Sequence, residues 1–200
     1  MAVVGVTPRL FPAIEWFLYL PPQPVINVQA KWDKRDKATH RYRVADVHGP
    51  IELTMPLEKP RSFTESTLAD ISISRHGNWW HNHRVTLESG YGRTPYFEYY
   101  FPKLEKFFSA DTIDAFPLLS EYLVATTNTL FEMLDLPQRL DIVRQEVARR
   151  TQEELILPEY YQIRAARLGF ITGLSILDLL FNIGPEAQLY LRCLNPTLYY

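Results

Sequence analysis

Two parts of this sequence carry side chains suited to ligand binding and to proton transfer. The first is the segment KWDKRDKATHRYR, residues 31–43, which has six lysine and arginine residues in thirteen positions. Within it Arg41 and Arg43 are two residues apart, so in a strand both side chains project from one face. Two adjacent guanidinium groups suit bidentate binding of a phosphate or a carboxylate. The alternative is a solvated basic loop, partly neutralised by Asp33 and Asp36.

The second part contains three of the five histidines, at positions 76, 81 and 83. Imidazole is the side chain best suited to proton transfer near neutral pH, which makes His83 a candidate general base. A histidine packed beside Trp79 or Trp80 more often has a structural role. Because His81 and His83 do not share a helix face and no zinc-ligand spacing is present, we predict no metal site.

An aromatic segment extends from Tyr91 to Phe108. Core packing explains most of such a cluster. Tyrosines beside Arg93 can also line a cleft on which a sugar or a base stacks, which makes Tyr91 a candidate for ligand contact.

The residues after the first apolar run exclude several classes of cofactor site. Residues 2–6 (AVVGV) lead into Thr-Pro-Arg-Leu-Phe-Pro and not into a glycine-rich loop. The sequence therefore has no dinucleotide-binding motif, P-loop or nucleophile elbow, and we predict no cofactor. The single cysteine, Cys193, precludes an intramolecular disulfide and fits a reducing, cytoplasmic location.

The composition is that of one globular domain spanning residues 1–200. The chain is 46% hydrophobic, 14% aromatic and 22% charged, with a formal net charge of −2. A negative net charge and one short basic segment argue against nucleic acid as a partner. No apolar run is long enough to span a bilayer, and the first residues lack the features of a signal peptide.

The first elements must position the basic segment. Residues 2–6, Leu10–Leu20 and Val25–Ala30 predict a strand, a helix and a second strand, which is a βαβ crossover with parallel strands. Next, Arg41–Asp46 and Ile51–Leu57 flank a short turn and predict a β-hairpin. A further strand is expected at residues 70–74, where apolar and polar side chains alternate.

From residue 78 onward, helices dominate the pattern. The predicted fold class is therefore α/β, a small mixed sheet that begins with the βαβ unit and the hairpin and is covered by a helix-rich C-terminal half. Residues 155–200 suggest a C-terminal helical appendage, in which Leu174–Phe181 is apolar on nearly every side, as in a core helix or a homodimer contact. The predicted helices are Trp79–Ser89, Tyr96–Phe108, Phe116–Leu134, Leu140–Arg150, Ser175–Asn182 and Pro185–Cys193.

The order of five motifs resembles the WbqC-like family, bacterial proteins encoded among surface-polysaccharide biosynthesis genes. LFPAIEWF (Leu10–Phe17), which carries Glu15, takes the place of the family's first box. KATHRYR (Lys37–Arg43) and LTMPL (Leu53–Leu57) come next, and Gly169–Ala187 is the last box. The fourth box is matched by Trp79, His83, Ser89, Tyr91, Pro95, Phe97 and Tyr100. The family's Arg-Asn-Arg reads Arg-Tyr-Arg here, and the tyrosine that precedes it is a histidine.

The resemblance implies a transferase that attaches an acyl or aminoacyl group to an amino sugar, on a nucleotide-sugar or a lipid-linked precursor. In this reading His83 accepts the proton as the amine attacks, and the partner is a small molecule, either a nucleotide-sugar or an acyl donor. The alternative is a non-catalytic binding or assembly protein, in which the basic face docks an anionic metabolite or an acidic partner and His83 is structural. The expected substrate contacts are Glu15, Lys37, Arg41, Arg43 and Tyr91.

Overall fold

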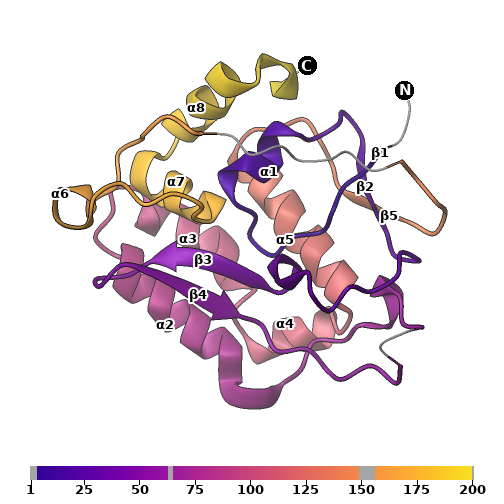
Figure 1. Ribbon diagram of the computed structural model, residues 1–200. Helices are drawn as coiled ribbons and strands as arrows, with labels where there is room; N and C mark the ends of the chain where they lie inside the picture. Colours follow the sequence, from indigo (N-terminus) through magenta and orange to yellow (C-terminus); the bar gives the residue numbers. More distant parts are fainter. Residues whose placement is uncertain (1–3, 63–64, 149–155, 200) are drawn as a thin grey trace.

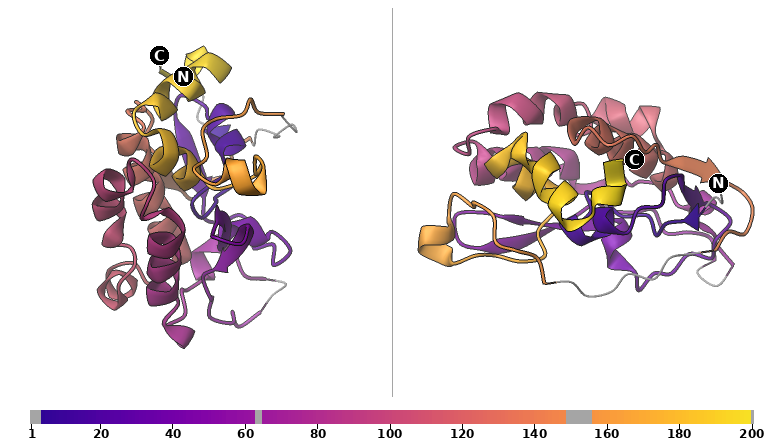
Figure 2. Two further views of the ribbon diagram at one scale, coloured as in Figure 1. Left: turned by 90° about the vertical axis from the view of Figure 1, so that its left-hand side faces the viewer. Right: turned by 90° about the horizontal axis from the view of Figure 1, so that it is seen from above.

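A computed structural model of the chain describes residues 4–62, 65–148 and 156–199. The strands of the N-terminal half lie on one side of the helices formed by residues 79–133 (Figure 1). The two views of Figure 2 show these two layers edge-on, with the C-terminal helices at one end. Among the described residues, no helix combines the length and the apolar character needed to cross a bilayer.

The predicted βαβ unit is present. Strand β1 (Val4–Gly5) and strand β2 (Pro24–Asn27) pair in parallel, and helix α1 (Ile14–Leu18) lies between them in the sequence. The helix is shorter than the predicted Leu10–Leu20, because Phe11 has a φ of +40° and breaks the helical path before it can start. Packing accounts for this conformation, since the buried Phe11 ring contacts the Tyr42 ring at a centroid distance of 4.9 Å.

The third strand of this sheet overturns one prediction. The sequence pattern of Leu140–Arg150 predicts a helix, but residues Asp141–Val143 form strand β5, which pairs in parallel with β2. The Asn128 side chain fixes the start of β5, because its amide donates to the Leu140 carbonyl at 3.0 Å and accepts from the Leu140 N–H at 2.8 Å. Pairing with a distant strand has overridden the local helical pattern.

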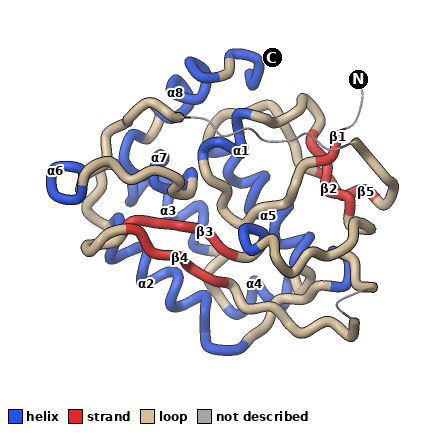
Figure 3. The backbone as a smooth tube through the Cα atoms, viewed as in Figure 1, coloured by secondary structure: helices blue, strands red, loops and turns tan. Residues whose placement is uncertain are grey.

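The predicted hairpin is also present, and it forms a sheet of its own. Strands β3 (Arg41–Ala45) and β4 (Pro50–Thr54) are antiparallel, and Arg43 pairs with Glu52 in their register. Figure 3 shows this two-stranded sheet apart from the three-stranded sheet β1-β2-β5.

Residues 70–74 do not form the predicted strand. A short 3-10 helix, Leu68–Asp70, precedes two isolated bridges that join Ile73 to Leu57 and Ser72 to Leu118. Residues 70–74 therefore form single β-bridges with two different segments, and they do not pair with either segment as a continuous strand.

The main helices lie close to their predicted places. Helix α7 (Ile176–Ile183) is buried along its whole length, so it is a core helix and offers no exposed face for a dimer contact. Residues 174–198 contribute to the same hydrophobic core as the N-terminal half. The other predicted helices are α2 (Trp79–Tyr91), α3 (Phe97–Glu105), α5 (Leu119–Met133) and α8 (Glu186–Leu194), and two further short ones are α4 (Ala110–Ala115) and α6 (Ala165–Leu168).

Candidate functional site

A cavity of about 450 Å³ lies where the segment before α1, the 3-10 turn Lys37–Thr39, strand β3 and the loop before α7 meet. We call it the cationic cavity. Four of the predicted substrate contacts line it, and they are Glu15, Lys37, Arg41 and Arg43. Arg9 and Glu52, which the sequence did not single out, also line it.

The two arginines reach the cavity because β3 alternates between faces. Tyr42 and Val44 are buried, whereas Arg41 is half-buried and Arg43 is exposed on the opposite face. The Ser175 N–H donates to the Arg43 carbonyl at 2.8 Å, which brings the loop before α7 against the strand. Arg41 and Arg43 therefore project from the same face of β3, opposite the buried side chains of Tyr42 and Val44.

One of these arginines already has a partner. The Arg41 Nη1 donates to Glu52 Oε1 at 2.7 Å across the hairpin. The Arg41 Nε is buried and has no acceptor among the described residues. A buried donor without an acceptor costs free energy, so an anionic ligand at this position would be stabilised by it.

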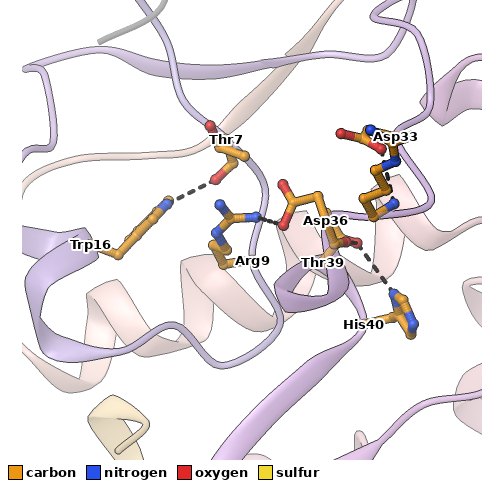
Figure 4. A network of polar contacts seen from close by, with 8 residues as sticks. Thr7, Arg9, Trp16, Asp33, Asp36, Thr39 and His40 are labelled. Atoms are coloured by element: carbon orange, nitrogen blue, oxygen red, sulfur yellow. Dashed lines mark hydrogen bonds and ion pairs between the residues drawn. The ribbon is translucent and has the colours of Figure 1, made fainter. Parts of the chain in front are cut away.

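Arg9 is held at the cavity by an ion pair with Asp36 (Figure 4). The same figure shows Trp16 donating to the Thr7 carbonyl at 2.8 Å, which fixes the chain on either side of Arg9. Asp36 therefore neutralises Arg9, which lies outside residues 31–43, so this ion pair is not the neutralisation within the basic segment that the alternative interpretation expects.

Lys37 and Arg43 remain as the unneutralised charges. Among the ion pairs of the described residues, none includes either side chain. Of the four cationic side chains of the cavity, Arg9 and Arg41 are paired with Asp36 and Glu52, which leaves two cations against the one carboxylate of Glu15. An excess of positive charge on a concave surface favours an anionic ligand.

Glu15 lies in the first turn of α1, on the wall shared with the loop before α7. No ion pair of the described residues includes it. Burial and the nearby Glu15 charge raise the pKa of Tyr190 to about 12, so this tyrosine lies in the neighbourhood of the carboxylate. An unpaired carboxylate at the edge of a cationic cavity can bind an ammonium group or accept a proton.

His83 does not line this cavity. Its side chain is only 3% exposed and lies among the rings of Tyr42, Trp79 and Phe108. Its Nδ1 is 3.2 Å from the Tyr42 hydroxyl and its Nε2 is 3.1 Å from the Thr54 carbonyl, so both ring nitrogens are occupied. Burial lowers the pKa of His83 to about 4, against a smaller opposing effect of the bond to Thr54. This placement gives the expected catalytic role no support.

Tyr91 does not line the cavity either. Its hydroxyl accepts from the Ala45 N–H at 2.8 Å, and its ring is buried against Phe181. Burial and the nearby Asp178 charge raise its pKa well above 10. His83 and Tyr91 are therefore both interior side chains, and their hydrogen bonds join α2 to the hairpin.

Metal binding has no support in the described part of the chain, where no three histidine, cysteine, aspartate or glutamate side chains gather. His40, beside the cavity, adds no charge near neutral pH. Burial, together with the charges of Arg41 and Lys37, lowers its pKa to about 4.

Sequence reasoning missed Arg9, Glu52, Gly173 and Ser175. The predicted hairpin did not point to Glu52, because strands at Arg41–Asp46 and Ile51–Leu57 place Thr54 opposite Arg43, whereas the observed register pairs Arg43 with Glu52. For the other three residues no local pattern exists, since tertiary packing alone brings them to the cavity.

A comparison with protein-family models matches residues 8–158 to the WbqC-like protein family. Comparisons with curated proteins and with solved structures give no match. The matched range includes every charged side chain of the cationic cavity and stops before Gly173 and Ser175. Because the match extends over most of the chain, this protein belongs to the WbqC-like family.

Proposed function

We propose that this protein is a transferase that moves an acyl or aminoacyl group to the amine of an amino sugar. The observation that carries the proposal is the cationic cavity, in which Lys37 and Arg43 have no carboxylate partner among the described residues. A phosphate of a nucleotide-sugar or of an activated acyl donor is the ligand that two such cations favour.

The reaction needs a place for a proton and a place for a leaving group. The amine nitrogen attacks the acyl carbon, a carbon–nitrogen bond forms, and the bond from that carbon to the leaving group breaks with its electron pair. In the proposal Arg43 and Lys37 stabilise the negative charge of the leaving group. Glu15 accepts the amine proton, because its carboxylate lies in the cavity wall without an ionic partner.

His83 has no part in this scheme, since both of its ring nitrogens are bonded inside the core. Nucleotide-linked and carrier-linked donors are cytoplasmic metabolites, so we propose a cytoplasmic location, with which the exposed free Cys193 is consistent.

Calorimetric titration with pyrophosphate tests the binding half of the proposal. Arg43→Gln should weaken pyrophosphate binding about tenfold to a hundredfold, because it removes a charge-assisted hydrogen bond. Arg144→Gln is the matched control, since Arg144 is exposed and lies away from the cavity. Equal affinities of the two variants would refute the assignment of the cavity.

Glu15→Gln tests the chemical half. It keeps the size of the side chain, so pyrophosphate binding should persist while transfer from an acyl phosphate to glucosamine, followed by mass spectrometry, falls at least tenfold. Unchanged transfer by this variant would remove Glu15 from the mechanism.

One observation favours a second candidate, a non-catalytic binding protein. The cavity has no imidazole, because His40 and His83 are both turned into the interior. A binder would be stabilised by its anionic ligand, by about 2.7 kcal/mol at a hundred times the dissociation constant, without forming product.

A further inference from the structure

A second cavity of about 490 Å³ adjoins the cationic cavity. We call it the apolar cavity, because hydrocarbon and aromatic side chains form most of its wall. The two cavities share two residues, Glu15 and Gly173, so each opens along the same edge of α1 and of the loop before α7. The apolar wall includes Ile14, Leu157, Tyr160, Phe170, Ile171 and Leu174.

Arg43 marks the junction between the two cavities. Gly173 has a φ of +65°, and a Cβ at this position would lie 3.3 Å from the Arg43 Nη1. The Arg43 guanidinium group therefore lies next to Gly173, which lines both cavities. An anion bound by Arg43 would sit at the junction, with the apolar cavity directly beside it.

The wall of the apolar cavity is fixed from the core. Tyr160, whose ring meets Phe170 edge-on at 5.2 Å, donates its hydroxyl to Asp178 Oδ2 at 2.7 Å. The Gln162 amide donates to the same oxygen at 3.0 Å and to the Ile171 carbonyl at 2.9 Å, and it accepts from the Ile171 N–H at 2.9 Å. Both stretches of the wall are thus anchored to α7, so the cavity is formed before a ligand arrives.

We propose that the apolar cavity binds the hydrocarbon part of an acyl donor whose activating phosphate is held by Arg43. This inference rests on the proposed function and narrows its donor to a soluble, activated acyl group with an apolar chain or ring. The acyl carbon then lies at the junction, next to Glu15, where the amine must attack. The volume of the cavity is in the range that small-molecule ligands occupy.

A series of alkyl phosphates tests the proposal on the unmodified protein. Ethyl, butyl, hexyl and dodecyl phosphate share one anionic head and differ only in apolar surface. Calorimetry should show affinity rising about fourfold for each methylene that enters the cavity, and levelling once the cavity is full. Vesicles of phosphatidylcholine with phosphatidic acid should not bind, because the cavity is bounded. Binding to these vesicles would assign the site to a lipid surface and overturn the proposal.

Thr172→Trp tests the position of the chain. Thr172 is exposed and lines only the apolar cavity, so tryptophan should fill it and abolish the gain between ethyl and hexyl phosphate while leaving ethyl phosphate binding intact. Val85→Trp is the matched control, because Val85 has a similar shape, is exposed on α2 and lines neither cavity.

The results separate the two proposals. If ethyl phosphate binds through Arg43 but affinity does not depend on chain length, or if Thr172→Trp retains the full gain, the apolar cavity is not the acyl site and the proposed function stands. If Arg43→Gln binds every alkyl phosphate as the unmodified protein does, the proposed function fails and this inference fails with it.

Discussion

The buried imidazole of His83 makes the stability of the protein depend on pH. The pKa of His83 is about 4 in the folded chain and about 6.5 in an unfolded one. Because the folded pKa is the lower of the two, the unfolded state takes up the proton first as the pH falls below 6.5. Stability from this group is therefore complete above pH 6.5 and is lost progressively down to pH 4.

The size of the effect can be worked out from the two pKa values. Between pH 7 and pH 5 the preferential protonation of the unfolded state removes about 2 kcal/mol from the free energy of unfolding. His83→Gln removes the titrating group, so this share of the loss should disappear in the variant. His40 has a pKa lowered in the same direction by burial, and it remains as a source of acid sensitivity in both proteins.

Urea denaturation at pH 7 and at pH 5, followed by circular dichroism, measures the difference. His83→Gln should be less stable than the unmodified protein at pH 7, because it breaks the bonds to Tyr42 and Thr54, and the gap should shrink by about 2 kcal/mol at pH 5. His81→Gln, an exposed substitution on the same helix, is the control. A difference in stability that stays constant with pH would show that folding does not lower the pKa of His83, which would refute its assignment to the interior.

Three further substitutions test other parts of the structure. Glu52→Gln frees the arginine paired with it, so calorimetry should show pyrophosphate binding severalfold tighter, with a change in stability below about 1 kcal/mol; weaker binding would contradict the charge balance of the cavity. Asn128→Ala leaves the N–H and the carbonyl of Leu140 without their hydrogen-bond partner, so urea denaturation should show a free energy of unfolding about 1–3 kcal/mol lower. An unchanged denaturation midpoint would refute the role given to Asn128. Gly184→Ala, at a φ of +56°, would put a Cβ 2.4 Å from Tyr96 Cγ, so thermal melting should show a loss of about 1–3 kcal/mol; full stability would contradict the close approach.

The elements that hold the arginines were predictable because their signals are local. Side chains two residues apart lie on the same face of a strand, so Arg41 and Arg43 share a face whichever segment this strand pairs with. The hairpin itself could be predicted from the sequence, although its turn occupies residues 46–49 and its second strand starts at Pro50 and not at the predicted Ile51.

Contacts with distant segments explain both the wrong helix prediction and the placement of His83, whose expected catalytic role stays a prediction. The helix expected over residues 140–150 gives way to β5 because β2 offers a parallel ladder from more than a hundred residues earlier. The role expected of His83 depended on its surroundings, and these come from β3 and β4, which lie 41 and 29 residues away in the sequence. Periodicity carries no information about such distant partners.

The anchoring of the second cavity's wall on Asp178 has a consequence for how this protein can change over evolution. The backbone path of residues 160–171 depends on the Tyr160 hydroxyl and the Gln162 amide, which bond to Asp178 of α7 and to the Ile171 backbone. Positions such as Phe170 and Thr172, which line the cavity and take no part in these bonds, can therefore be exchanged without breaking them. Relatives that keep the buried Asp178 carboxyl and its Gln162 partner could therefore differ in the shape of this cavity without any change of fold.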